Sequence, residues 1–191
     1  MKKILATIGT AVFLVSVLPM VAGAVEPIEV KTFAQWCEEK ESVPEATRRT
    51  IDAVLGQAGT NDCQLADRKL RDLTNLDLSY NAISDLKPLA GLINLENLRI
   101  SLGNISDLEP LAGLIKLGRL SLHNSRIINL KPLAGLSKLY LLNLSDNTIS
   151  DLKPLRGLTN LKYLNLRSNQ INDLKPLNGL INLTELNLNS N

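Results

Sequence analysis

Few residues in this chain could take part in acid–base, nucleophilic or metal chemistry. His123 is its one histidine, and Cys37 and Cys63 are its two cysteines. The sequence pattern gives His123 no nucleophile to activate, fixes no pair of carboxylates and contains no glycine-rich phosphate loop. We therefore expect no catalytic residue, no metal site and no cofactor, and a protein that is not an enzyme.

The first 24 residues have the features of a secretory signal peptide. Two lysines begin the segment, an apolar run over residues 4–21 follows, and small residues end it at Ala24. The alternative is an uncleaved membrane anchor, but Gly9 and Pro19 interrupt the apolar run. We expect cleavage after Ala24 and a secreted protein, which is then extracellular, periplasmic or bound at the cell surface.

The charge of the chain excludes two classes of partner. The formal net charge of +2 is due to Lys2 and Lys3, so the processed chain would be formally neutral. A neutral chain has no overall field to attract nucleic acid or anionic lipid. We expect no nucleic-acid partner and no stable membrane insertion after cleavage.

Export also decides how the two cysteines are interpreted. In an oxidising compartment an even pair usually forms a disulfide. Cys37 and Cys63 are 26 positions apart with no neighbouring histidine, which fits neither a CxxC redox motif nor a zinc cluster. We predict a structural disulfide between them.

Residues 25–72 differ in composition from the rest and indicate a helical N-terminal cap. Pro44 stands at a plausible helix start, and the apolar residues from Ile51 to Ala58 recur at helical spacing before Gly59. A second apolar face surrounds Trp36. A polar, disulfide-linked cap of this kind would cover the apolar end of a repeat array.

Residues 73–191 repeat with a period of 22. The leading leucines are Leu73, Leu95, Leu117, Leu139, Leu161 and Leu183, and the unit reads LxxLxLxxNxIxDLxPLxGLxx in five full copies and a partial sixth. Alternating leucines predict a short strand with one buried face, and the Pro and Gly positions predict a 3₁₀-like return segment. One such unit cannot bury its apolar face alone, so the units must stack.

This pattern resembles the leucine-rich repeat, and the unit is most similar to the 22-residue class of bacterial internalins, whose secreted members carry a helical cap before the repeats. The resemblance implies an α/β solenoid. It would be a leucine-rich-repeat horseshoe or arc with a parallel β-sheet on its concave face and 3₁₀-like turns on its convex face. It also implies a non-catalytic module that recognises a protein or peptide ligand through the concave face.

The asparagine of the repeat predicts a ladder of amide hydrogen bonds between coils. The residues that hold this position are Asn81, Asn147, Asn169 and Asn191. Gly103 and Ser125 replace it, so repeats two and three are predicted to be the irregular part of the stack.

Binding residues are sought at the outward strand positions, where unusual side chains interrupt a background of serine and asparagine. Exposed tyrosine and arginine are favoured anchors in recognition. The alternative is ordinary variation on a polar surface. The candidates are Tyr80, Arg99, Leu102, Arg119, His123, Leu141, Tyr163 and Arg167.

The sequence stops at Asn191 within a repeat, with no polar closing segment. Terminal repeats normally need such a cap. Three explanations stay open: a truncated reading frame, a fragment of a longer adhesin-like or enzyme-bearing repeat protein, and a structural envelope element that self-associates end to end through its last repeat.

Overall fold

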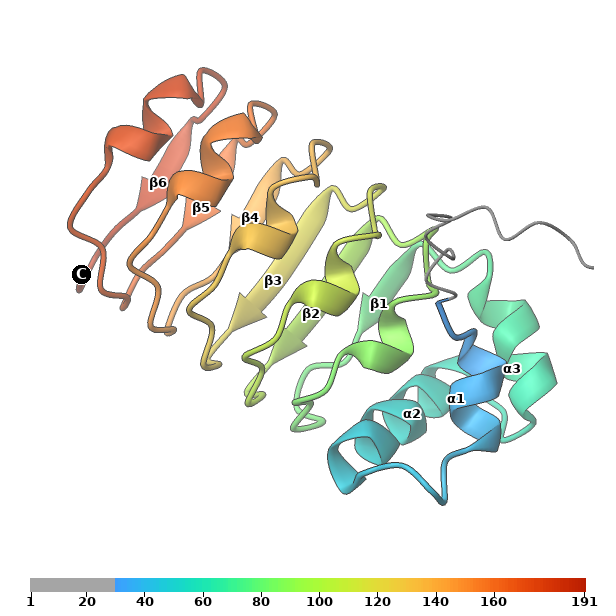
Figure 1. Cartoon of the computed structure of the whole chain (residues 1–191). Coiled ribbons are helices and arrows are strands. Elements are labelled where there is room, and N and C mark those ends of the chain that lie inside the picture. The colour runs from blue at the N-terminus through green and yellow to red at the C-terminus, as the bar shows by residue number, and fades with distance from the viewer. Residues whose placement is uncertain (1–29) are drawn as a thin grey trace, which may run out of the picture.

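Three helices precede a sheet of six strands in residues 30–191, which are the residues that the computed structural model describes (Figure 1). The helices are α1 (Phe33–Glu38), α2 (Glu45–Ala58) and α3 (Cys63–Leu70). The strands are β1 (Asn75–Asp77), β2 (Asn97–Ser101), β3 (Arg119–His123), β4 (Leu141–Asn143), β5 (Tyr163–Asn165) and β6 (Glu185–Asn187). The expected signal peptide and its cleavage after Ala24 lie outside the described residues.

A short 3₁₀ helix follows each of the first five strands. These helices are η1 (Lys87–Leu89), η2 (Glu109–Leu111), η3 (Lys131–Leu133), η4 (Lys153–Gly157) and η5 (Lys175–Gly179). Proline lies in the first turn of each, and Asp85 shows how the turn begins: its Oδ1 accepts a hydrogen bond from the amide of Lys87 at 3.0 Å. An Asp or Asn makes the same contact in the four later coils.

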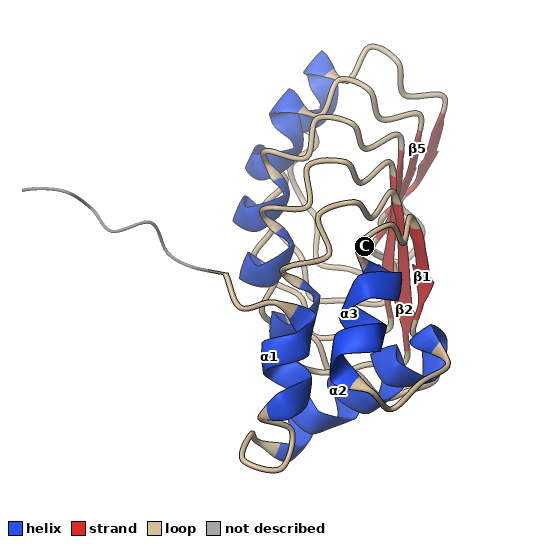
Figure 2. Ribbon diagram, turned by 90° about the vertical axis from the view of Figure 1, so that its right-hand side faces the viewer, coloured by secondary structure: helices blue, strands red, loops and turns tan. Residues whose placement is uncertain are grey.

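The strands are all parallel and lie in chain order, so each coil stacks on the one before it. Paired residues are 22 positions apart, as Leu76 and Leu98 show. The 3₁₀ helices cover one side of the sheet and leave the other side open (Figure 2). The strand leucines fill the interior, where Leu120 and Leu122 have no exposed surface. The predicted leucine-rich-repeat solenoid with a helical cap is confirmed.

The three helices extend the apolar core of the repeats at its N-terminal end. Ile51 and Val54 of α2 have no exposed surface, and Phe33 of α1 is 1% exposed. The predicted disulfide is confirmed, because Cys37 of α1 is bonded to Cys63 of α3. A helix of six residues is too short to be stable alone, so α1 depends on these contacts.

Two threonines of α2 bind the first coil of the array. The hydroxyl of Thr50 donates to the backbone oxygen of Asp85 at 2.7 Å, and that of Thr47 donates to its carboxylate at 2.6 Å. Both threonines are buried. The cap is therefore joined to the repeats by hydrogen bonds as well as by apolar packing.

Strand length varies along the sheet for a local reason. β1, β4, β5 and β6 have three residues and end in Asp or Asn, whose side chain accepts a hydrogen bond from the amide two residues later. This turn engages one amide that follows the strand, although other backbone hydrogen bonds to the next coil continue, as from Leu78 to Arg99. Arg99 and Ser121 hold that position in β2 and β3, where pairing continues to Ser101 and His123. Repeats two and three thus differ from the other repeats in the sheet, where their strands are the longest.

None of the helices in residues 30–191 is long and apolar enough to cross a bilayer.

Candidate functional site

The open side of β1–β6, called the sheet face below, carries most of the predicted binding residues. Strand register places Arg119 of β3 beside Leu141 of β4, and Leu141 beside Tyr163 of β5. Arg119 is exposed and Leu141 is half-buried, whereas Tyr163 is 40% exposed. A basic, an aliphatic and an aromatic side chain thus form one row across three adjacent strands.

Tyr140 holds Arg119 in place. Nε of Arg119 donates a hydrogen bond to the hydroxyl of Tyr140, and its guanidinium lies 5.3 Å from the centre of the tyrosine ring. Gly118 makes room for this ring, because a Cβ there would lie 2.8 Å from Cε1 of Tyr140. The sequence analysis missed Tyr140. The one signal for it was Gly118, a residue without a side chain at the same position of the preceding repeat, where a large ring has room.

Arg99 and His123 lie on the two longest strands and line the same groove as Arg119. Nδ1 of His123 is 3.3 Å from the hydroxyl of Ser121, which is paired with Arg99 across the strands. Arg99 also faces Asp77 on its other side. Burial raises the pKa of the Asp77 carboxyl, but hydrogen bonds from Ser79 and the charge of Arg99 outweigh it and hold that pKa below its usual value.

Two grooves divide the sheet face. The N-terminal groove has a volume of about 800 Å³ and includes Arg99, Arg119 and His123 in its lining, with Gln57 of α2 at its edge. The C-terminal groove has a volume of about 650 Å³ and includes Tyr163. Leu141 lines both grooves. Five of the eight candidates therefore meet in two adjoining grooves.

The remaining three candidates line neither groove. Arg167 follows β5 and is exposed. Tyr80 and Leu102 lie just past β1 and β2 with φ values of 64° and 57°, and they are 79% and 49% exposed. Asn124, Asp146, Ser168 and Ser190 occupy the same left-handed position in later repeats. Tyr80 and Leu102 are bulky residues in a conformation that suits asparagine, and they form a separate exposed edge.

The predicted ladder asparagines differ in the hydrogen bonds that they make. Asn147 is 8% exposed; its Oδ1 accepts from the amide of Ile127 at 3.0 Å, and its Nδ2 donates to three backbone oxygens, including that of Leu122. Asn169 and Asn191 make the equivalent contacts with the preceding coil. Asn81 is exposed and donates only to Ser79, because helix α2 occupies the place of a preceding coil.

The described residues contain no group of three or more His, Cys, Asp or Glu side chains placed to hold a metal ion. The chemistry that the sheet face offers is hydrogen bonding, ion pairing and apolar contact.

Comparison with known proteins places these coils among leucine-rich repeats. The family model for leucine-rich repeats (two copies) matches residues 71–113. Internalin C2 of Listeria monocytogenes is 46% identical over 64% of this chain and 54% of its own, with a TM-score of 0.62. Internalin F of the same organism is 42% identical over 66% of this chain and 37% of its own, with a TM-score of 0.63.

A more distant match is the leucine-rich-repeat ectodomain of the plant receptor kinase GASSHO1/SCHENGEN3 from Arabidopsis thaliana, solved in complex with CASPARIAN STRIP INTEGRITY FACTOR 2. It is 26% identical over 64% of this chain and 16% of its own, with a TM-score of 0.57. None of the curated proteins compared matches this chain. The matched region spans about half of the internalin C2 chain and just over a third of the internalin F chain.

Proposed function

Because this chain is an internalin-like leucine-rich-repeat protein, we propose that it recognises a protein or peptide partner through the sheet face, without catalysis. The observation that carries the proposal is the uncovered sheet. Parallel sheets are normally buried on both faces. Here the 3₁₀ helices cover one side only (Figure 2), and the other side is open to a partner.

The size and chemistry of this surface suit a peptide or a small protein patch. Six strands about 4.8 Å apart give a face roughly 24 Å across. Its two grooves have volumes of about 800 and 650 Å³ and meet at Leu141. Tyr163 and Arg119 offer the kinds of anchor that dominate binding energy in interfaces.

We further propose that the module acts outside the cytoplasm, as a cap over residues 25–72 followed by repeats over residues 73–191. The bond between Cys37 and Cys63 supports this location, because disulfides persist in oxidising compartments. The signal-like sequence that ends at Ala24 supports it too. Expression in a secreting bacterium and N-terminal sequencing of the exported protein test the location; a start at residue 25 is expected, and retention in the cytoplasm would contradict it.

Binding through the sheet face can be tested before the partner is identified. A displayed library of random twelve-residue peptides is selected on the full chain, and enriched peptides are measured on a variant carrying Leu141→Ser and Tyr163→Ala. We expect affinity to fall about tenfold or more, because the variant removes apolar anchors from both grooves.

The control carries Ile115→Ser and Ile128→Ser, which remove apolar side chains that are 61% and 63% exposed and line neither groove. Peptide affinity should be unchanged in this control. Equal affinity for the wild-type chain and the Leu141/Tyr163 variant would exclude the sheet face as the binding surface.

A further inference from the structure

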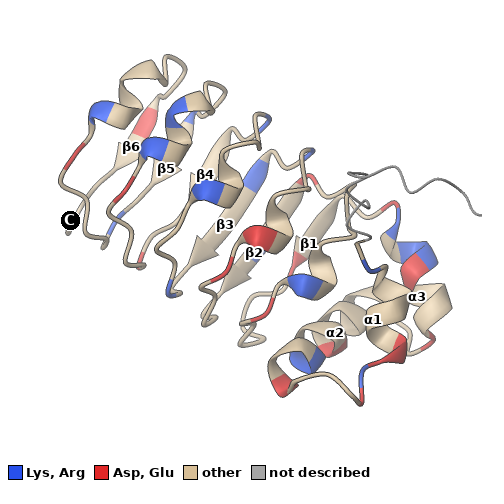
Figure 3. Cartoon of the chain, in the orientation of Figure 1, with Lys and Arg blue, Asp and Glu red and all other residues tan. Residues whose placement is uncertain are grey.

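Charge is distributed unevenly across the sheet face. The outward positions of β1 and β6 include the carboxylates Asp77 and Glu185. The outward positions of β2 to β5 hold no acidic residue. They and the next outward position after β5 carry four basic side chains, Arg99, Arg119, His123 and Arg167. Figure 3 shows the same trend, with a basic residue at the start of β3 and an acidic one at the start of β6. The middle of the face is therefore cationic.

Two of these cations are close neighbours. Arg99 is paired with Ser121, two positions after Arg119 on the adjacent strand. Strand spacing and rise place the Cα atoms of such diagonal residues about 8 Å apart. Asp77 is the one acidic residue next to Arg99 in the strand register, and its Oδ1 already accepts a hydrogen bond from the amide of Ser79 at 2.9 Å. Arg99 thus has one partly engaged carboxylate beside it, and no acidic residue is paired with Arg119 in the strand register.

The position of the Arg119 guanidinium suits an anionic ligand. Tyr140 engages its Nε and lies against its guanidinium. Its two terminal nitrogens make no hydrogen bond to any other part of the described chain. Two parallel N–H groups on a fixed guanidinium match the two oxygens of a carboxylate. The stack with Tyr140 reduces the side-chain entropy that Arg119 would lose on binding.

An apolar site adjoins this cation. Leu141 and Tyr163 follow Arg119 in the same row, one and two strands further along. An extended peptide that crosses the strands advances about 6.6 Å between residues i and i+2, whose side chains point to the same side. If residue i of the peptide lies over Arg119, residue i+2 therefore lies between Leu141 and Tyr163.

We propose that the partner presents an acidic segment with an extended backbone. An Asp or Glu at position i binds the terminal nitrogens of Arg119, with Arg99 as a second cation, and an apolar residue at i+2 packs between Leu141 and Tyr163. The inference rests on the proposed function and specifies its ligand class through charge complementarity.

The test uses a fluorescein-labelled peptide, Gly-Ser-Asp-Ser-Leu-Ser-Asp-Ser-Leu-Ser-Gly, and a matched peptide with Asn in place of each Asp. Fluorescence anisotropy with the full chain measures both affinities at low and at physiological salt. The acidic peptide should bind about tenfold more tightly, because each carboxylate adds charge-assisted hydrogen bonds. This advantage should shrink as salt screens the ion pairs.

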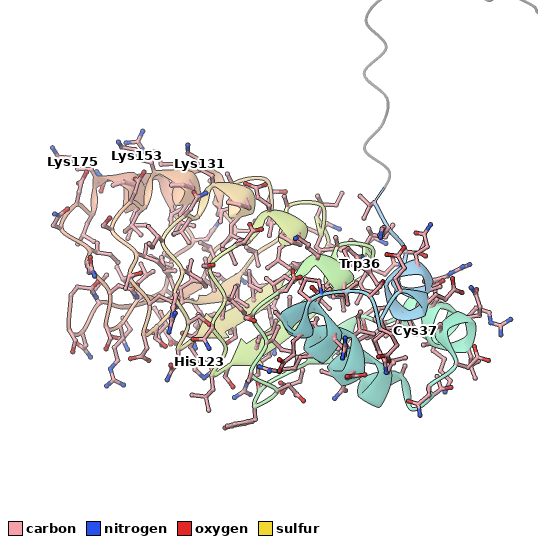
Figure 4. All side chains as sticks on the ribbon, turned by 60° about the horizontal axis from the view of Figure 1, so that its bottom comes forward. Trp36, Cys37, His123, Lys131, Lys153 and Lys175 are labelled. Carbon is pink, nitrogen blue, oxygen red and sulfur yellow. A yellow bond between two sulfur atoms is a disulfide. The ribbon has the colours of Figure 1, made fainter. Side chains whose placement is uncertain are left out.

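Two charge-neutralised variants locate the cationic site. Arg99→Gln with Arg119→Gln should abolish the preference for the acidic peptide. Lys131→Gln with Lys153→Gln removes the same charge from the row of lysines on the side away from His123 (Figure 4) and should preserve the preference. Equal loss in both variants would show general attraction to positive charge and would overturn the inference.

The remaining outcomes separate this inference from the proposed function. Equal affinity of the wild-type chain for both peptides, lost on Tyr163→Ala, would overturn the acidic motif and retain binding through the sheet face. Binding that depends neither on the arginines nor on Tyr163 would overturn both. Binding of neither peptide would overturn the acidic motif, and the library selection would still test the sheet face.

Discussion

At the scale of single residues, the ladder asparagines are the most demanding positions in the array. The side chain of Asn147 satisfies three backbone oxygens and one amide, and two of these four groups belong to the preceding coil. Backbone groups buried without a partner are costly. Each ladder asparagine therefore stabilises two coils at once.

Replacement of Asn147 by alanine should lower the free energy of unfolding by about 2 to 4 kcal/mol, because several buried backbone groups lose their partner. Asn81→Ala is the matched control and should change it by less than about 0.5 kcal/mol, since Asn81 is exposed. Urea unfolding followed by circular dichroism measures both. Similar losses in the two variants would contradict a role for contacts between coils.

Replacement of Tyr80 should have the opposite effect on the free energy of unfolding. Its φ of 64° is unfavourable for a tyrosine, and the side chain is 79% exposed, so little packing is lost when it is replaced. We expect Tyr80→Asn to raise the unfolding free energy by about 1 kcal/mol. The reverse change at the equivalent position, Asn124→Tyr, should lower it by a similar amount. A less stable Tyr80→Asn protein would show that the tyrosine makes contacts outweighing its backbone strain.

Single residues also mark where sequence reasoning succeeded and where it failed. The row containing Arg119, Leu141 and Tyr163 follows from the 22-residue period alone, because identical positions in successive strands must be adjacent. The contact of Arg119 with Tyr140 could not be derived in this way, since it joins different positions of two repeats and depends on the space at Gly118. The period likewise assigned Asn81 to the ladder, although the coil that it would contact is replaced by a helix.

At the scale of elements, the turn of the second coil lies against the backbone of the first. Gly103 holds the asparagine position in the second coil, and a Cβ there would lie 2.4 Å from the backbone oxygen of Ile83 in the first. The amide of Asn104 donates to the same oxygen at 3.0 Å. The amides of Arg126, Thr148 and Gln170 make the same bond in later coils, so this bond is common to the array. What distinguishes Gly103 is that its approach to Ile83 leaves no room for a side chain.

The closeness of Gly103 to Ile83 predicts that alanine substitution has different effects on stability at two glycines. Gly103→Ala should lower the unfolding free energy by about 1 to 3 kcal/mol, because the backbone of the first coil must move to admit a methyl group. Gly113→Ala should be neutral or slightly stabilising, since a Cβ there meets no atom within 4 Å. Thermal unfolding of both variants measures the difference. An unchanged midpoint for Gly103→Ala would show that the coils separate freely.

At the scale of the whole molecule, a helical cap and a repeat array must unfold either together or in sequence. Stability in repeat proteins is shared between neighbouring units, and each interface sets how strongly they are coupled. Thr47 and Thr50 supply buried hydrogen bonds between the cap and the first coil, and Arg49 adds an exposed one to the backbone oxygen of Ala82. Trp36, the one tryptophan of the chain, lies in the cap beside Cys37 (Figure 4) and reports on the cap separately from the sheet.

We expect Trp36 fluorescence and circular dichroism to give one coincident urea transition in the wild-type chain. Thr50→Val leaves the oxygen of Asp85 without this donor at a cost of about 1 to 3 kcal/mol. The fluorescence transition should then move to lower urea than the circular dichroism transition. Thr148→Val, a change within the repeats, should not separate them. Two transitions that shift together in Thr50→Val would show that other contacts couple the cap.

The architecture could be predicted from the sequence because its leucines repeat at a fixed period, and the disulfide because the chain offers one possible pair. Helix α3 and the contacts of α2 with Asp85 were not foreseen, because the cap has no repeat and its packing depends on side chains far apart in the chain. The longer strands β2 and β3 were also missed. These strands are longer where Arg99 and Ser121 stand in place of the Asp or Asn whose side chain forms a turn at the end of the other strands. The same two repeats lack the ladder asparagine, which is why they were predicted to be irregular.

The fit of Tyr140 against Gly118 has a consequence for how such an array can be rearranged genetically. A duplication of the Tyr140 repeat by itself would set a second tyrosine ring against the first, in a place where even a methyl group is too close to the ring. A deletion of the Gly118 repeat would set the ring against Glu96. A copy of the fourth repeat therefore fits only where a copy of the third precedes it, although every repeat in the chain has the same length.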